Sequence, residues 1–156
     1  MQEEEILEQV RSFWTSRAIL TAADLDLFTA LEGGGATAED LSLAKGLDTR
    51  ATGRLLDSLV ACGYLEKSQD RYRLTQQGAP LSAEHPRSVL PVVRHMSHVW
   101  NNWSNLTQSV ISGINPERSN PVTDLGDEEQ SDFIEAMDVL GREMAEEIAE
   151  EYGGTS

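Results

Sequence analysis

Apolar residues recur at three- and four-residue steps over the first part of the chain, which is the spacing of one face of a helix. The first run predicts an amphipathic helix with apolar positions Ile6, Leu7, Val10, Phe13, Trp14, Ala18 and Ile19. A second helix is predicted over residues 22–32, with apolar positions Leu25, Leu27, Phe28 and Leu31. The Gly33-Gly34-Gly35 run ends it, so two helices open the chain.

Capping residues predict the next two helices. Thr37 and Asp40 have the three-residue spacing of a capping box, and Gly46 is a natural left-handed stop. Asp48 is in position to cap a further helix, which ends at Gly63. The apolar positions of that helix are Leu55, Leu56, Leu59 and Val60.

The period changes from helical to strand-like after Gly63. Residues 64–67 and 71–74 read as two short strands joined by the polar turn at residues 68–70, which together predict a β-hairpin. Two short helices packed at an angle and followed by a two-stranded ribbon form a winged helix-turn-helix. We therefore predict a mainly α fold, with a winged-helix domain over residues 1–80.

Long helices are predicted for residues 81–156. A loop over residues 80–91 leads into a helix over about residues 88–112, whose apolar positions are Val89, Val92, Val93, Met96, Val99, Trp100, Trp103, Leu106, Val110 and Ile111. Such a wide apolar surface exceeds what one small domain can cover. Pro116 and Pro121 frame a linker, and a final helix is predicted over residues 128–152.

The charge of the chain is unevenly distributed. Of the net −15, residues 124–156 carry −11, while residues 33–78 are neutral. Nucleic-acid-binding proteins usually show the opposite balance, because Lys and Arg contacts to phosphate supply most of the affinity. Cys62 is the only cysteine, so no intramolecular disulfide is possible. The acidic balance therefore predicts no nucleic-acid partner. The sequence contains no membrane span and no secretory signal, so we expect a cytoplasmic protein that does not bind a membrane.

In their order along the chain, four segments resemble the plant-type and bacterial small-molecule O-methyltransferases, which depend on S-adenosylmethionine. Residues 13–31 match the family's opening, an aromatic residue and small residues followed by Ala-x-x-Leu-x-Leu-Phe-x-x-Leu. Residues 54–65 and 72–78 are similar to its winged-helix segment. His95 before Trp103-x-x-Leu106, and Phe133-x-x-Ala136-Met137, match two further signatures. The resemblance covers residues 10–152.

This resemblance implies an N-terminal dimerisation domain that forms an intertwined homodimer and closes one wall of an acceptor pocket. The residues expected at the dimer interface are Phe13, Trp14, Leu25, Phe28, Val99 and Trp100. Those expected to contact the acceptor are His95, Trp103, Phe133 and Met137. The acceptor would be a small aromatic or polyketide-like molecule. Core packing also explains aromatic and Met residues on these helices.

Cofactor and catalytic residues are not expected in this chain. In the family a Rossmann-like domain, with a strand and a Gly-rich turn, holds S-adenosylmethionine. Here the last predicted helix is followed by Gly153-Gly154-Thr155-Ser156, without an apolar strand or a Gly-x-Gly turn. S-adenosylmethionine is therefore implied for the full-length family only, and O-methylation is not distinguished from N-methylation.

Two other interpretations of the sequence, a metal site and a DNA-binding regulator, are weighed against this one. His95 and His98 would share a helix face, but two ligands make a weak metal site, so we predict no metal. A stand-alone dimeric winged-helix transcriptional regulator is the alternative function. Its phosphate and base contacts would come from Arg50, Arg54, Lys67, Arg71 and Arg73. Acidic residues lie among these cations and cancel their charge, at Asp48, Asp57, Glu66 and Asp70.

Overall fold

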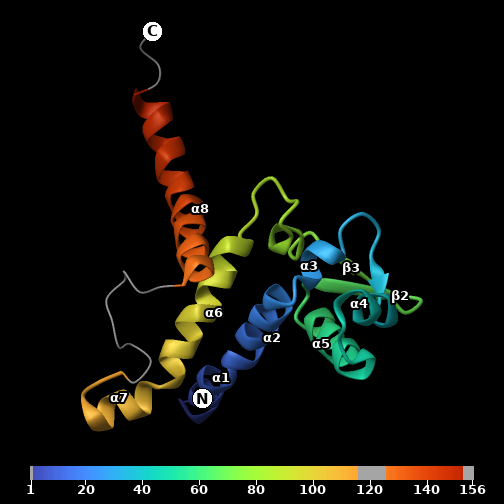
Figure 1. The fold of residues 1–156 in the computed structure, drawn as a ribbon, viewed down its shortest axis with the longest axis horizontal. Coiled ribbons are helices and arrows are strands. Elements are labelled where there is room, and N and C mark those ends of the chain that lie inside the picture. Colours follow the sequence, from blue (N-terminus) through green and yellow to red (C-terminus); the bar gives the residue numbers. More distant parts are fainter. Residues whose placement is uncertain (1, 116–125, 153–156) are drawn as a thin grey trace. The chain divides into compact units, whose positions relative to one another are not determined.

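A computed structural model describes residues 2–115 and 126–152 of the chain (Figure 1). It divides into two compact units, Met1–Leu90 and Pro91–Ser156. The predicted linker framed by Pro116 and Pro121 lies outside the described residues, as do Gly153 to Ser156. Within the described ranges, no helix combines the length and the apolar character that crossing a bilayer requires.

The first unit is a winged helix preceded by two helices. Its elements are α1 (Gln2–Arg11), α2 (Phe13–Asp24), α3 (Leu27–Ala30), β1 (Ala36–Thr37), α4 (Ala38–Lys45), α5 (Thr49–Ala61), β2 (Leu65–Ser68), β3 (Arg71–Leu74) and the 3-10 turn η1 (Ala79–Leu81). Helix α5 is central, because it contacts α2, α4 and β2 (Figure 1). The predicted mainly α, winged-helix fold is confirmed.

The two capped helices form as the sequence predicts. The Thr37 hydroxyl accepts from the Asp40 backbone N–H and the Asp40 carboxylate accepts from the Thr37 N–H, both at 3.0 Å, so the capping box is complete. Gly46 ends α4 in the left-handed conformation, with φ 68°. The Asp48 carboxylate accepts from Ala51 N–H at 2.7 Å and starts α5. Local side-chain chemistry therefore fixes both helix starts.

The predicted hairpin forms and gains a third strand. β2 and β3 pair in antiparallel register around Gln69 and Asp70, which both have positive φ, as a two-residue hairpin loop requires. β1 adds to the other edge of β3, with Ala36 opposite Tyr72, and gives the sheet order β1-β3-β2. β1 has only two residues, which is too short for an alternation of apolar and polar residues to predict it.

The core of the first unit is complete within one chain. Its buried apolar residues are Leu20, Ala22, Ala23, Leu27, Phe28, Leu31, Leu41, Leu56, Leu59, Leu65, Tyr72, Leu81 and Leu90. A fully buried Leu or Phe side chain contributes about 1.5–3 kcal/mol relative to leaving it in water. This unit therefore has an apolar core of its own.

The two opening helices differ from their predicted boundaries. The predicted single helix through residues 6–19 is wrong, because Ser12 interrupts it between α1 and α2. The Ser12 hydroxyl and N–H both donate to the Gln9 carbonyl, which replaces the regular helical bond by a tighter turn. The predicted helix over residues 22–32 is also wrong: α2 extends to Asp24, and Asp26, with φ 51°, separates it from α3.

The second unit consists of α6 (Leu90–Ser104), α7 (Leu106–Ser112) and α8 (Asp127–Tyr152). The final helix is confirmed, but the single helix predicted over residues 88–112 is wrong, because it breaks at Asn105. Near the break, Ser104, Asn105 and Ser109 each donate from the side chain to the carbonyl four residues earlier. Such bonds compete with the helical ladder and bend helices, which explains the interruption.

Candidate functional site

Helices α1 and α2 expose a run of large apolar side chains, called here the α1–α2 apolar surface. Its members are Ile6, Leu7, Val10, Phe13 and Trp14, all exposed within nine positions. The Phe13 and Trp14 rings contact edge to face with centroids 6.0 Å apart, and Trp14 keeps 61% of its surface exposed. Large exposed apolar side chains gathered in this way are typical of protein interaction sites.

The other predicted interface residues lie at different depths. Leu25 is half-buried at the end of α2, and Val99 and Trp100 are half-buried on α6. Phe28 has no exposed surface within the chain. Its side chain therefore supports the neighbouring helices from the core, and gives no area of its own to a partner.

Two of the four predicted acceptor-contact residues, His95 on α6 and Phe133 on α8, contact each other, and a third, Met137, also lies on α8. The rings of His95 on α6 and Phe133 on α8 contact edge to face, with centroids 5.3 Å apart. Met137 follows Phe133 by one helical turn and is 42% exposed. The His95 Nδ1 is buried and has no hydrogen-bond partner among the residues that the structure describes. Trp103, further along α6, is 66% exposed.

Beside this ring contact lies a polar pair that the sequence did not predict. The His98 Nε2 and the Asp132 Oδ2 are 2.9 Å apart and both side chains are largely covered. A carboxylate oxygen can only accept, so the imidazole N–H donates. The two residues are 34 positions apart, and the only available signal was that Asp132 immediately precedes the Phe133 motif.

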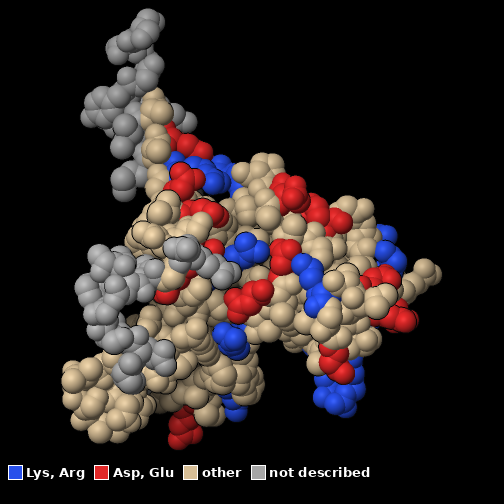
Figure 2. All heavy atoms as spheres, viewed as in Figure 1, with Lys and Arg blue, Asp and Glu red and all other residues tan. Residues whose placement is uncertain are grey.

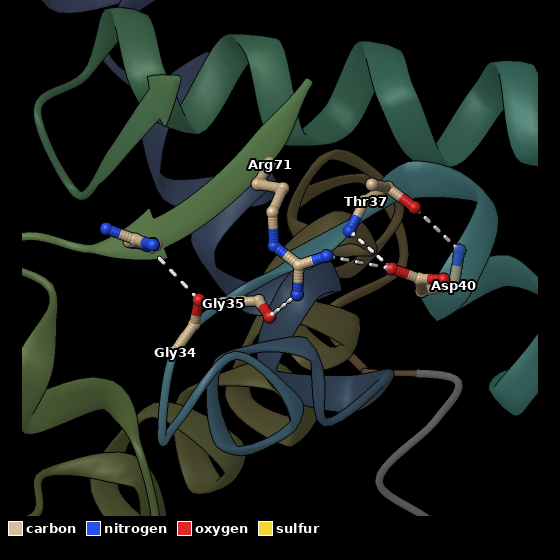
Figure 3. Close-up of polar contacts among 6 residues, drawn as sticks. Gly34, Gly35, Thr37, Asp40 and Arg71 are labelled. Carbon is tan, nitrogen blue, oxygen red and sulfur yellow. Dashed lines mark hydrogen bonds and ion pairs between the residues drawn. The ribbon is translucent and has the colours of Figure 1, made fainter. Parts of the chain in front are cut away.

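The arginines of the hairpin are held by the chain itself. Arg71 donates to the Gly35 carbonyl at 2.6 Å and pairs with the Asp40 carboxylate at 3.7 Å, and Arg73 donates to the Gly34 carbonyl at 3.1 Å (Figure 3). Backbone hydrogen bonding from Thr37, followed by that from its side chain, lowers the pKa of Asp40. These contacts attach the glycine loop and the start of α4 to the hairpin.

The hairpin lysine is held in the same way. Lys67 pairs with Asp57 on α5 at 2.9 Å and lies over the Tyr72 ring, 4.7 Å from its centroid. The buried Tyr72 hydroxyl donates to the same Asp57 oxygen at 2.8 Å. These hydrogen bonds, with that of Lys67 the larger, lower the pKa of Asp57. Three of the five cations suited to DNA contact therefore have partners within the chain.

Arg50 and Arg54 remain exposed on the first two turns of α5. On the face drawn in Figure 2, Lys and Arg atoms lie interspersed with Asp and Glu atoms. Phosphate contacts need a positive surface, which an even mixture of both signs of charge does not provide.

The sequence of the winged-helix unit matches a known family. Residues 7–83 match the family model of the O-methyltransferase dimerisation domain. The chain belongs to this family. The matched residues contain the winged helix and all of the α1–α2 apolar surface except Ile6, so this part of the molecule is a dimerisation domain.

Similar proteins are methyltransferases. O-methyltransferase SfmM3 of Streptomyces lavendulae is 32% identical over 140 residues, which cover 86% of this chain and 42% of that protein. Tetracenomycin polyketide synthesis 8-O-methyl transferase TcmO of Streptomyces glaucescens is 40% identical over 70 residues, which cover 44% of this chain and 21% of that protein. The chain therefore spans less than half the length of these curated relatives.

The fold also recurs in a solved methyltransferase structure. N,N-8-amino-8-demethyl-D-riboflavin dimethyltransferase (RosA) from Streptomyces davawensis superimposes with a TM-score of 0.80 at 23% identity. The match covers 94% of this chain and 47% of that chain. At this identity the likeness shows the fold alone.

The glycine-rich segment of this dimerisation domain does not fit a nucleotide cofactor. Gly33, Gly34 and Gly35 follow helix α3, whereas a dinucleotide-type turn follows a strand and opens a helix at the phosphates. The carbonyls of Gly34 and Gly35 already accept from Arg73 and Arg71. No role in holding S-adenosylmethionine is therefore assigned to this loop.

Proposed function

We propose that this chain is the dimerisation and acceptor-lid part of a cytoplasmic, S-adenosylmethionine-dependent methyltransferase. It forms a homodimer through the α1–α2 apolar surface together with Val99 and Trp100 of α6. The observation that carries this proposal is the exposed aromatic pair Phe13 and Trp14, on a domain whose family is defined by dimerisation. Aromatic side chains are the usual energetic centres of protein interfaces.

The acceptor contacts belong to α6 and α8 in this proposal. The aromatic rings of Phe133 and Trp103 suit a flat aromatic or polyketide-like acceptor, and the thioether of Met137 adapts to an irregular outline. The name of TcmO, a polyketide-synthesis methyl transferase, supports this class of acceptor. The proposal covers methylation of either oxygen or nitrogen, because no residue of the acceptor contacts distinguishes the two.

The chain is expected to be a homodimer at micromolar concentration. Obligate interfaces bury more than about 2,000 Å², enough to cover the apolar side chains that one chain leaves in water. Light scattering coupled to size exclusion should give about 34 kDa, twice the 17.2 kDa of one chain. A mass of one chain at this concentration would refute the proposed homodimer.

We expect no sequence-specific DNA binding, which separates this proposal from a transcriptional regulator. Lys67, Arg71 and Arg73 are held by contacts within the chain, and a homodimer would carry twice the net charge of −15. That charge repels a duplex over about 8 Å at physiological salt. Fluorescence anisotropy with DNA from upstream of the protein's own gene, at low salt, measures binding.

Arg54→Ala is the variant that makes this measurement decisive, because Arg54 is exposed on α5. Weak binding that salt removes and that ignores sequence agrees with the dimerisation proposal. Nanomolar binding that Arg54→Ala abolishes would instead establish the regulator.

A further inference from the structure

Two adjacent residues of α8 contact two residues of α6 that lie one turn apart. Asp132 hydrogen-bonds to His98 at 2.9 Å, and the neighbouring Phe133 packs its ring against His95. One contact is polar and directional, while the other is a ring contact that tolerates sliding. Two such points, on consecutive turns of α6, define both the axial position and the rotation of α8.

The polar contact is placed where water competes little with it. The side chain of Asp132 is 15% exposed and that of His98 is 30% exposed. Hydrogen bonds to a charged group are stronger than neutral ones, and removing one partner leaves the other covered and unsatisfied. Exposed pairs on the same helix, such as Asp138 with Arg142 at 3.9 Å, are screened and contribute little.

We propose that His98 and Asp132 are positioning residues for the acceptor wall, by which we mean His95, Phe133 and Met137. Their hydrogen bond sets the rotation of α8 on α6, and thereby holds Phe133 against His95 and presents Met137 one turn further on the same side of α8. Neither residue contacts the acceptor itself. This inference rests on the proposed acceptor contacts of His95, Phe133 and Met137.

Loss of the pair should loosen α8 without unfolding the first unit. In Asp132→Ala, amide hydrogen exchange over residues 131–140 should become about tenfold faster, because a charge-assisted hydrogen bond then no longer opposes local opening. Exchange in α5 should not change, because Leu56 and Leu59 keep their core. The methyl resonance of 13C-labelled Met137 should shift in the same variant.

The variant set tests whether the pair acts as a unit. His98→Ala should reproduce Asp132→Ala, and the double variant should be no worse than either single one. His98→Gln keeps a side-chain N–H donor and should restore part of the Met137 signal and of the exchange protection. Asp138→Ala is the matched control, since it removes an exposed carboxylate from the same helix and should change neither. Unchanged exchange and an unchanged Met137 signal in Asp132→Ala would overturn the inference.

Acceptor binding is tested with alizarin, a flat hydroxylated aromatic molecule, by titration against the Met137 methyl signal. Wild-type binding that weakens about tenfold in Asp132→Ala, but not in Asp138→Ala, supports the positioning role. Equal affinity of the wild type and Asp132→Ala would overturn it. If alizarin leaves the wild-type signal unchanged while Asp132→Ala still loosens α8, the alignment of α8 stands and the proposed acceptor contacts fail.

Discussion

Replacing Gly35 by alanine should lower the stability of the winged-helix unit by about 3 kcal/mol, the combined cost of a left-handed non-glycine residue and of overpacking. Gly35 has φ +77°, and a Cβ built on it would run into the Tyr72 carbonyl oxygen and the Arg73 side chain. The clash falls where β1 pairs with β3, so relieving it separates Ala36 from Tyr72. Thermal unfolding followed by circular dichroism should show a melting temperature lower by about 15 °C.

Gly33→Ala is the matched control for this effect. Gly33 has φ +76°, nearly the same as Gly35, but a Cβ there meets no atom within 4 Å. It should cost only about 1 kcal/mol, the strain of a left-handed alanine. If both variants lose the same stability, the close approach of Gly35 to β3 contributes nothing. That result would contradict the claim that the contacts of Gly35 with β3 stabilise the sheet.

Features governed by local chemistry were predictable from the sequence. The Thr37–Asp40 capping box, the left-handed Gly46 and the Asp48 cap depend only on residues three to nine positions apart, and all are present. The hairpin followed from a change of period after Gly63, and the family resemblance followed from four segments in order. The caps and the hairpin are each complete within a short stretch of chain, whereas the resemblance depends on the order of four short segments.

Helix interruptions were not predictable from apolar spacing. The apolar positions continue at helical steps through Ser12 and Asn105, so the pattern predicts unbroken helices. The breaks come from side chains that bond to nearby carbonyls, and Ser and Asn also occur in regular helices. β1 escaped prediction because it exists only through its pairing with β3.

The burial of individual side chains and the pairing of residues far apart in the sequence could not be predicted either. Apolar spacing marks Phe13 and Phe28 alike, yet Phe13 is 46% exposed and Phe28 is fully buried. Which of them can meet a partner depends on how α2, α3 and α5 pack. Likewise, His98 and Asp132 are ordinary polar helix residues until the fold brings α6 and α8 together. Of the residues singled out in the sequence, His95 and Phe133 are in contact in the structure, whereas the pairing of His98 with Asp132 could not be predicted.

Trp14→Glu should convert the proposed homodimer into a folded monomer. Trp14 is 61% exposed on α2, so a glutamate there costs little in the isolated chain, whereas in a packed interface it buries a charge and removes an aromatic anchor. Interface anchors of this kind contribute about 4 kcal/mol, which corresponds to a dissociation constant about a thousandfold larger. Analytical ultracentrifugation across nanomolar to micromolar concentrations measures the change.

Leu43→Glu separates an effect of position from an effect of added charge. Leu43 lies on α4, is 85% exposed, and is outside the α1–α2 apolar surface, so this variant should remain a dimer. The monomeric Trp14→Glu chain should keep its helical circular dichroism, because Leu27, Phe28, Leu56 and Leu59 form a core within one chain. If Trp14→Glu still dimerises, the α1–α2 apolar surface is not the dimer interface. If Leu43→Glu also abolishes dimerisation, the effect comes from added charge and not from this surface. Dissociation by Trp14→Glu alone, with the fold intact, would locate the dimer contact on the aromatic pair at the start of α2.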